Sequence, residues 1–413
     1  MTTTVGRRPS LWRNRDFLVI WSGQIVSTLG SRVSAMAMPL LVLSITGSAA
    51  DAGVVAAAAS LPYLVANLLA GTLVDRWDRR RVMLAGQLSA GAALASICVA
   101  WWLGVLTLPH LVIAAFVQGV CFVFYGLAEE AALPQIVPAV LLPAAIAQNE
   151  AKTRGAGLAG PPVGGALFGV GQAVPFLASA LSYLVAAFAL LFVRSDLRGE
   201  RAERPGSFWH DTTAGLRWLW GHPLIRAAVL LVAASNMIFA GLALVLVVLA
   251  EELGASSAET GVMMGVYGGG GLLGAVVAGR LHRRFSPRTV IIGVNWVWAV
   301  LLPLIAVAPH PLVAGLIAAG TSFVGPMWNI VIGTYQMTLV PNGMLGRVSS
   351  AGMTLSWGVI PVGSLAAGHL LTVVTPRVTM LVLGAGMLVT ALAATASTAV
   401  RHAPPLPAGD TPR

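Results

Sequence analysis

Two long uncharged segments on either side of a highly charged turn restrict this chain to a membrane fold. Residues 52–74 contain no charged side chain, and residues 82–103 contain none either. About 20 apolar residues in a helix suffice to cross the hydrocarbon core of a bilayer. The stretch that joins the two segments, Gly71–Met83, reads GTLVDRWDRRRVM. We interpret it as a short turn between two membrane helices, at a surface where anionic lipid favours arginine.

The composition excludes a water-soluble protein. Of the 413 residues, 57% are hydrophobic and 10% are charged, whereas about 25% of the residues of a typical soluble domain are charged. The formal net charge is +10, but the basic residues stand in short runs between apolar segments, which is typical of membrane topology signals. We therefore expect the lipid bilayer, and no nucleic acid, as a partner.

The apolar runs predict an all-α polytopic membrane protein with twelve transmembrane helices in two six-helix halves. The predicted helix centres lie near Gly30, Tyr63, Ala93, Gly119, Gly160, Leu184, Met237, Gly270, Val297, Ser322, Ile360 and Met387. The predicted domains are an N-terminal half (1–194), a cytoplasmic linker (195–222), a C-terminal half (223–400) and a cytoplasmic tail (401–413). Within the linker, Phe208–Trp220 has the pattern of an amphipathic helix on the membrane surface. Its apolar residues are Trp209, Leu216, Leu219 and Trp220.

The two halves resemble each other in sequence. Matching motifs occur in the same order at Gly71 and Gly279, Val137 and Val340, and Pro162 and Pro361, at offsets of 208, 203 and 199 (279 minus 71, 340 minus 137, 361 minus 162). A duplicated six-helix unit explains these offsets. Such halves, related by an axis along the membrane normal, place a binding site at their interface near the bilayer midplane.

The basic residues predict the orientation of the chain. They gather at the N-terminus, in the 76–81 turn, in the linker and near residues 280–288, which all fall on one side, while the opposite loops offer Arg377 alone. By the positive-inside tendency, both termini and the linker are cytoplasmic. Lys152 is the single lysine among many arginines, a bias typical of GC-rich bacterial genomes, so we expect a multi-pass protein of the bacterial plasma membrane.

Four motifs resemble one transporter family. The pattern G-x-L-x-D-R-x-x-R-R-R that starts at Gly71 resembles the loop between helices two and three of the major facilitator superfamily. The stretches WSGQIVS (Trp21–Ser27), ITGSA (Ile45–Ala49) and LPYL (Leu61–Leu64) resemble the macrolide-efflux branch of its drug:proton antiporters, which is also similar to siderophore exporters.

The resemblance implies a gating role for the charged turn. In this family the turn braces the cytoplasmic side, here with Asp75 facing the positive end of helix eleven near Arg347–Ser350. The simpler alternative is a solvated acid paired with Arg76 or Arg79. The predicted gating residues are Gly71, Asp75, Arg76, Arg79 and Arg80.

Helix five carries a glycine-proline element. Gly160, Pro161, Gly164 and Gly165 resemble the family's antiporter motif G-P-x-x-G-G, which implies export. Small residues one turn apart also permit close helix packing, and prolines bend a membrane helix. Ordinary glycine-rich packing is therefore the alternative interpretation.

Polar residues on helix one are candidates for substrate or coupling contacts. Gln24, Thr28 and Ser31 form a stripe at helical spacing, and Arg32 lies one turn beyond Thr28. An arginine near the midplane needs protein or a wet cavity around it, so Arg32 is the leading candidate; the alternative is a structural arginine. Lesser candidates at similar depth are Gln118, Asn236 and Asn329.

Acidic residues are scarce inside the predicted membrane region. Glu129 and Glu130 on helix four are candidates for proton transfer, and Glu150 with Arg154 suggests an ion cluster that includes Lys152. Charge pairing at the membrane surface is the alternative. The arginine that many exporters of the superfamily carry on helix four is absent, because Ala115 stands in its place.

These features favour a monomeric exporter of small amphipathic molecules, such as antibiotics or secondary metabolites, driven by proton antiport with alternating access. We expect no cofactor and no metal site. Export of siderophores or other metabolites is the alternative within transport. A polytopic membrane enzyme is the alternative outside it, although the sequence contains no HExxH metal pair, no nucleotide-binding loop and no evident catalytic triad.

Overall fold

The computed structural model describes residues 10–74, 77–195, 197, 208–281, 284–341 and 344–404, without the side chains of residues 65–74, 208–212 and 280. This part of the chain is helical, and it contains no β-strand. The α-helices are α1 (Arg15–Thr46), α2 (Ala49–Val74), α3 (Arg79–Trp102), α4 (Leu108–Ile136), α5 (Leu142–Val170), α6 (Val174–Leu190), α7 (Phe208–Gly221), α8 (Pro223–Glu252), α9 (Ser257–Leu281), α10 (Pro287–Ile305), α11 (Pro311–Leu339), α12 (Leu345–Gly358), α13 (Ile360–Val373), α14 (Pro376–Ala396) and α15 (Thr398–Arg401).

The helices occur where the apolar runs predict them. Each predicted centre lies within one of these helices. Among the described residues, nine helical stretches are long and apolar enough to cross a membrane, one of them running through α12 and α13. The described part of α2 as far as Leu64, and α6, are apolar but shorter. The all-α polytopic fold is thus confirmed, whereas the count of twelve stays a prediction, in which α2, α5 and α6 complete the set.

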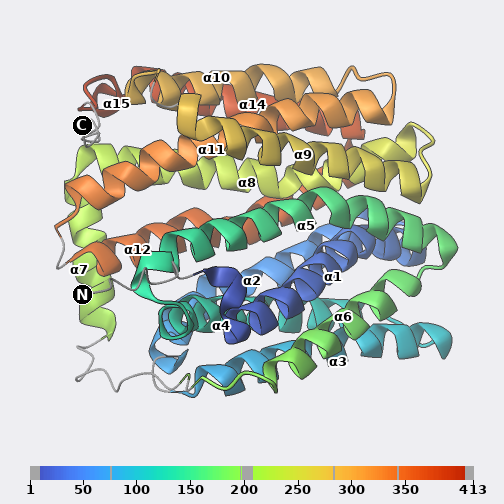
Figure 1. Ribbon diagram of the computed structural model, residues 1–413. Helices are drawn as coiled ribbons and strands as arrows, with labels where there is room; N and C mark the ends of the chain where they lie inside the picture. Colours follow the sequence, from blue (N-terminus) through green and yellow to red (C-terminus); the bar gives the residue numbers. More distant parts are fainter. Residues whose placement is uncertain are drawn as a thin grey trace, which may run out of the picture.

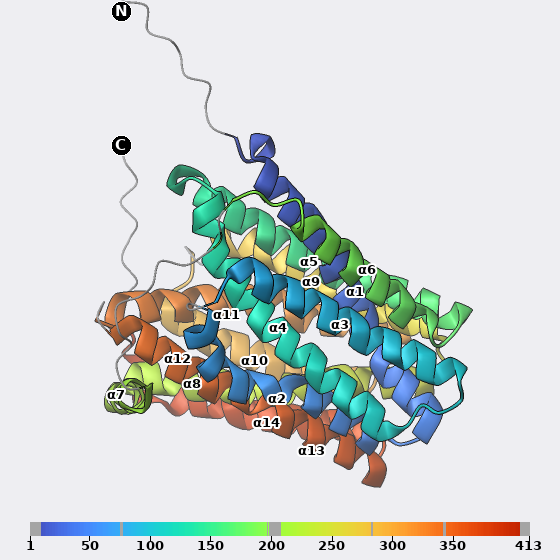
Figure 2. The same ribbon diagram turned by 90° about the horizontal axis from the view of Figure 1, so that it is seen from below.

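The helices pack in a pattern that occurs twice. In the first group α1 contacts α5 and α6, α3 contacts α4 and α6, and α2 contacts α4. In the second group α8 contacts α13 and α14, α10 contacts α11 and α14, and α9 contacts α11. Figure 1 shows the second group above the first, with α5 beside α9 between them, and Figure 2 shows the bundle from below. The groups meet through α5 with α9 and through α2 with α12 and α13.

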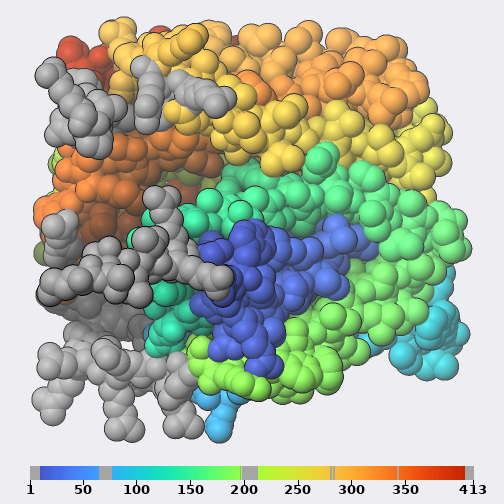
Figure 3. All heavy atoms as spheres, viewed as in Figure 1, coloured from blue at the N-terminus to red at the C-terminus, as the bar shows by residue number. Residues whose placement is uncertain are grey.

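The apolar cores follow this grouping. The largest cluster of buried side chains lies between Leu219 and Val400 in the sequence. The buried residues of the other clusters all come from the chain up to Leu197, except Leu244 of α8. In Figure 3 the green atoms of the first group adjoin the yellow atoms of the second. The packing supports the predicted division into two halves, which stays a prediction in its boundaries.

The eleventh predicted helix is broken in its middle. α12 ends at Gly358 and α13 begins at Ile360, with Val359 between them. Pro361 has no N–H to donate to the preceding turn, and its ring disturbs the helix there. We therefore attribute the break to Pro361.

The linker contains the predicted helix, α7, but α7 packs on protein. It contacts α12 and α8, and a Cβ on Gly215 would collide with the carbonyl oxygen of Arg347. Leu219 is fully buried, whereas Leu216 and Trp220 are exposed. The prediction that Leu219 faces the membrane is wrong, because the first turn of α12 covers this side of α7. We call the end of the bundle at α7 the linker end and the opposite end the far end.

Candidate functional site

The two halves are in backbone contact near the far end. A Cβ placed on Gly165 of α5 would lie 2.9 Å from the Cα of Gly261 in α9. Likewise, a Cβ placed on Gly53 of α2 would lie 2.9 Å from the Cα of Gly368 in α13. No side chain fits at either place, so glycine permits the two halves to close against each other.

These two contacts are related by the duplication. Gly261 follows Gly53 by 208 residues (261 minus 53), and Gly368 follows Gly165 by 203 (368 minus 165). The sequence motifs suggested 199 for the fifth and eleventh helices, and this value is wrong by four residues (203 minus 199), about one helical turn. Residues four apart share a helix face, so a motif displaced by one turn still looks equivalent.

The glycine-proline element of α5 faces two helices at once. Gly160 and Gly164 face α1, where a Cβ on Gly160 would collide with the Cβ of Arg32. Pro161 and Gly165 face α9 of the other half. Close packing therefore accounts for these four residues, and their link to export stays a prediction.

Arg32 lies beside aromatic residues at the junction of the halves. Its side chain is exposed, and within the described ranges its guanidinium has no hydrogen bond and no ion pair. Tyr63 on α2 and Tyr183 on α6 lie within range of its charge. The ring of Tyr63 packs against Trp357 of α12, with ring centroids 5.2 Å apart. This group joins both halves, and we call Arg32, Tyr63 and Trp357 the central group.

A second polar group is buried within the first half. Nζ of Lys152 on α5 forms an ion pair with Oε1 of Glu129 on α4 at 3.2 Å, and it donates a hydrogen bond to Oε1 of Gln24 on α1 at 2.5 Å. Nδ2 of Asn149 donates to the same Glu129 oxygen at 3.2 Å. We call Gln24, Glu129, Asn149 and Lys152 the polar cluster.

The predicted pair of Glu150 with Arg154 is confirmed, but the prediction that Lys152 joins this pair is wrong. Glu150 and Arg154 pair with each other at 2.7 Å, while Lys152 points to Glu129. Residues two apart lie on different faces of a helix, whereas residues four apart share one. This spacing was the signal in the sequence that Lys152 belongs to another set of contacts.

Two of the lesser candidates make contacts between helices of one half. Gln118 donates to the carbonyl oxygen of Ala90 at 3.0 Å and accepts a hydrogen bond from Tyr183 at 3.2 Å, which ties α4 to α3 and α6. Asn236 donates to the carbonyl oxygen of Ser356 at 2.8 Å, which ties α8 to α12. These contacts favour the structural interpretation for Gln118 and Asn236.

The remaining candidates differ in exposure. Ser31 lies near the hydroxyl group of Tyr183, and Thr28 is half-buried. Glu130 and Asn329 are exposed. Glu130 lies close enough to Glu129 for their charges to interact, but outside the polar cluster.

The charged turn is described in part. Arg80 donates from Nε to the carbonyl oxygen of Leu190 at 3.0 Å and from Nη2 to that of Leu191 at 2.6 Å, so it caps the end of α6. Arg79 donates to the carbonyl oxygen of Ala131 on α4 at 2.9 Å. A cation at the C-terminus of a helix is favourable. Gly71 lies in α2, while Asp75, Arg76 and their predicted contact with helix eleven lie outside the described residues.

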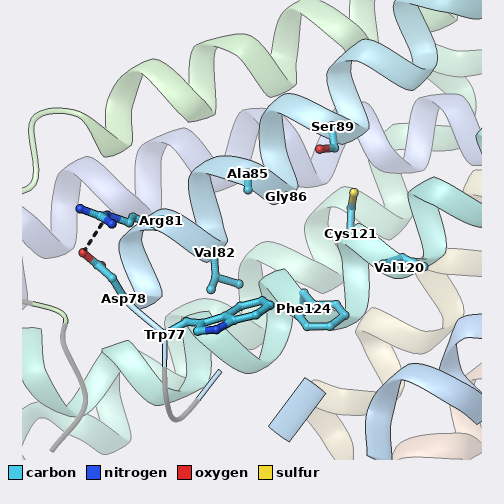
Figure 4. A pocket seen from close by; sticks show the side chains of 10 residues that line it. All are labelled: Trp77, Asp78, Arg81, Val82, Ala85, Gly86, Ser89, Val120, Cys121 and Phe124. Carbon is cyan, nitrogen blue, oxygen red and sulfur yellow. Dashed lines mark ion pairs between the residues drawn. The ribbon is translucent and has the colours of Figure 1, made fainter. Parts of the chain in front are cut away.

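A cavity of about 640 Å³ lies on the side of the first half, between α3 and α4. Figure 4 shows the side chains that line it. At its linker end Trp77 stacks on Phe124, and Arg81 pairs with Asp78 at 3.7 Å. The deeper wall includes Cys121. Neither the central group nor the polar cluster lines this cavity.

Sequence reasoning missed several residues of these sites. Tyr63 and Trp357 were not singled out as site residues, because an aromatic ring in an apolar run has no pattern of its own, and Asn149 was not, because it stands among other polar residues, Gln148 and Glu150. Tyr125 and Gln87 flank the polar cluster from α4 and α3. Gln87 is a polar residue in a helix segment without charged residues. Its polarity was a signal from which the sequence could have predicted a buried polar contact.

The chain matches one known protein family over nearly its whole length. The model of the family described as "Transmembrane secretion effector" matches residues 9–405. The multidrug efflux pump Tap of Mycobacterium tuberculosis is 28% identical over 418 aligned positions, which cover 97% of each chain. Macrolide efflux protein A of Streptococcus pyogenes is 27% identical over 45% of this chain and 46% of its own length.

Among solved structures, a mutant of the nucleoside transporter NupG resembles this chain with a TM-score of 0.76 and 12% sequence identity. The likeness covers 93% of this chain and 100% of that chain. At this identity the comparison concerns the fold alone.

Proposed function

Because this chain belongs to the transmembrane secretion effector family of major facilitator superfamily transporters, we propose that it exports small amphipathic molecules in exchange for protons. Membership of a transporter family removes the support for the membrane-enzyme alternative. The names of the relatives, a multidrug efflux pump and a macrolide efflux protein, make antibiotics the first cargo to test.

The observation that carries this proposal is the interface between the halves. The halves touch at paired glycines near the far end, and the central group brings a cation and two aromatic rings together from α1, α2 and α12. The backbone contact of α5 with α9 continues inward as far as Gly157 and Gly268. An interface between two halves that holds polar and aromatic groups beside such close helix contacts suits alternating access. We assign cargo contact to Arg32 in the first place, and to Thr28, Ser31 and Asn329 in the second.

Orientation underlies this mechanism. We propose that the linker end is cytoplasmic, since the arginines of the charged turn, α7 and Arg401 lie there. The halves then comprise 1–194 and 223–400, and one chain acts as a monomer. Reporters fused after Arg198 and after Arg401 should read as cytoplasmic, and a reporter in the loop 251–259 as external. An external reading after Arg198 would overturn this topology.

The charged turn has a gating role in this proposal. Asp75→Asn retains the size of the side chain and removes its charge, so the variant should reach the membrane in normal amount and export poorly. Efflux at the wild-type rate would assign Asp75 to the solvated alternative.

The cargo contact can be tested with erythromycin, a macrolide, in bacterial cells that lack their own pumps. Expression of the chain should lower erythromycin accumulation, and Arg32→Ala should reduce efflux by about tenfold, equivalent to about 1.4 kcal/mol. Arg32→Lys separates a charge effect, which lysine retains, from a forked contact, which it loses. Wild-type efflux by Arg32→Ala would remove Arg32 from the site.

The guanidinium of Arg32 also suits the alternative cargo, a siderophore or another metabolite. A cation without an acidic partner among the described residues favours carboxylate-bearing molecules, which include many siderophores and other metabolites. Export of a carboxylate siderophore by cells that fail to export erythromycin would favour this alternative.

A further inference from the structure

The polar cluster contains an unusually well buried ion pair. The side chain of Lys152 is 5% exposed and that of Glu129 is 19% exposed. Each of the other ion pairs of the described residues has a much more exposed partner: Arg81 is 80% exposed, Glu150 56% and Arg377 41%. Burying two charges rarely stabilises a protein more than an apolar pair does. A role in function therefore explains the pair better than stability does.

The hydrogen bonds around Glu129 are unequal. Oε1 accepts from both Lys152 and Asn149, whereas in the described part of the chain no hydrogen bond to Oε2 is found. A cavity of about 10 Å³ adjoins Glu129, Gln24 and Asn149 and extends toward Ile136 at the linker end of α4. This volume is near the minimum that one water requires. Oε2 of Glu129 is therefore free to take a proton, and the space beside it has about the volume of one water.

The amides beside the pair are incompletely bonded. Nε2 of Gln24 and Oε1 of Gln87 are buried and without a hydrogen-bond partner among the described residues, while Nε2 of Gln87 donates to the hydroxyl group of Ser27 at 3.3 Å. Tyr125 lies next to both amides. A buried polar atom without a partner is uncommon in native proteins. The two unpaired amide atoms, Nε2 of Gln24 and Oε1 of Gln87, supply hydrogen-bond partners for a second arrangement of the cluster.

Resting on the proposed function, we propose that Glu129 carries the exchanged proton and that Lys152 converts its protonation into movement of α5. A proton taken up from the far side adds to the Glu129 carboxylate and yields a neutral carboxylic acid. The ion pair is then lost, and the Lys152 ammonium keeps its hydrogen bond to Gln24. Release of the proton toward the linker end restores the carboxylate and the pair.

The position of Lys152 on α5 connects this step with the two halves. The same helix contacts α9 of the other half through Pro161 and Gly165. While the ion pair exists, it holds α5 to α4 and, through Gln24, to α1. Loss of the pair leaves the hydrogen bond from Asn149 to Glu129 in place but holds α5 less firmly to α4. This change alters the surface on which the halves close.

Among the other charged and titratable groups of these helices, Tyr125 and Glu130 of α4 lie within range of the charge of Glu129. On α1, Asp16 accepts from the backbone of Arg194 and Ser195, and Arg32 belongs to the central group. On α3, Arg79 and Arg80 donate to backbone carbonyls. On α4, Glu130 is exposed and Tyr125 adjoins the amides; on α5, Glu150 pairs with Arg154.

The first test measures the proton without any cargo. Infrared difference spectra of the purified protein between acidic and alkaline buffer should contain the band of a buried carboxylic acid, and Glu129→Gln should abolish it. Glu150→Gln, which changes an exposed acid on α5, should retain the band. An unchanged band in Glu129→Gln would overturn the assignment. Because no cargo is present, this result is independent of the proposed function.

The second test uses wild-type and variant protein in liposomes with radiolabelled erythromycin. Glu129→Gln should lose transport driven by a pH gradient by at least about tenfold, a loss of about 1.4 kcal/mol in transition-state stabilisation. It should still exchange erythromycin across the membrane without a gradient, which Glu129→Asp and Glu150→Gln should also do. Loss of both activities in Glu129→Gln would indicate a structural role and overturn the proposal.

Lys152 gives an independent readout. Lys152→Gln removes the cation that favours the carboxylate, so the pH midpoint of the infrared band should move to higher pH, whereas Lys152→Arg should leave it near the wild-type value. An unshifted midpoint in Lys152→Gln would exclude Lys152 from the switch. Absence of erythromycin transport by the wild type, with the infrared band present, would refute the proposed cargo and leave Glu129 as the proton site.

Discussion

The two halves of the molecule use matching helices for different purposes. At the offset of 203 residues, Glu129 of α4 corresponds to Ile332 of α11 (129 plus 203), and Lys152 of α5 corresponds to Leu355 of α12 (152 plus 203). Ile332 is buried, and Leu355 packs against the apolar core of the second half. The first half therefore holds an ion pair where the second half holds two apolar residues of its core.

The far end differs from this region, because there the halves agree. The two far-end contacts at Gly53 and Gly165 rest on glycine, and at each of them an added Cβ would lie 2.9 Å from the facing Cα. Gly160 lies against Arg32, and its counterpart Gly363 lies against Met237. The helix packing around Arg32 therefore has an equivalent in the second half, where an uncharged residue takes the place of the arginine. The comparison indicates that the shape of closure is shared by both halves, whereas among the described residues the buried ion pair occurs in the first half and the ion pair of the second, Arg377 with Glu252, is exposed.

The strongest test of this comparison gives the first half the residues of the second. Glu129→Ile or Lys152→Leu alone leaves a buried charge without its partner and should destabilise the protein by about 3–5 kcal/mol. The double variant should regain most of this stability and still fail to couple transport to protons. Thermal unfolding in detergent measures the stability, and equal stability of the single and double variants would contradict the comparison.

The shared closure can be tested at its glycines. Gly53→Ala places a Cβ 2.8 Å from the carbonyl oxygen of Ser364, and Gly165→Ala places one still closer to the carbonyl oxygen of Ser257. Strain of about 1–3 kcal/mol should reduce transport by about tenfold, more at Gly165 than at Gly53. Gly155→Ala is the control, since nothing lies within 4 Å of its Cβ among the described residues. Normal transport by both interface variants would disprove closure at the far end.

Helix ends offer a smaller contrast between the halves. Arg80 donates to two carbonyl oxygens at the end of α6, whereas Arg401 donates to one, that of Ala396 in α14, and is exposed. Arg80→Gln should lower the free energy of unfolding by about 1–2 kcal/mol and Arg401→Gln by about 0.5 kcal/mol. Unfolding temperatures of the two variants compare them directly, and a reversed order would indicate that exposure does not decide the difference.

The smallest effect belongs to the exposed ion pair of α5. Glu150→Gln removes the pair with Arg154 and should change stability by about 0.3–0.5 kcal/mol. The same measurement applies, and the value serves as the baseline for Glu129. A larger loss of stability would mean that the difference in burial between Glu150 and Glu129 does not explain a difference in their contributions.

The sequence predicted the helices because each needs a long apolar run, a property that neighbouring residues share. The break at Val359 was not predicted, although Pro361 gives its physical cause. The residues that face each other across helices were harder to predict. The spacing of Glu150, Lys152 and Arg154 already separated Lys152 from the other two, but the choice of Glu129 as its partner depends on how α4 packs against α5. Likewise, Trp357 meets Tyr63 only because α12 lies beside α2.

The anchoring of the linker limits how far the halves can separate. Leu197 is buried in a core cluster of the first half, and Leu219 is buried in the core of the second. The residues between Leu197 and the start of α7 number ten (207 minus 197). A chain of this length spans at most about 35 Å, whatever its conformation. The linker therefore acts as a tether of fixed reach, and the widest opening at the linker end is set by a length of covalent chain as well as by the contacts of the helices.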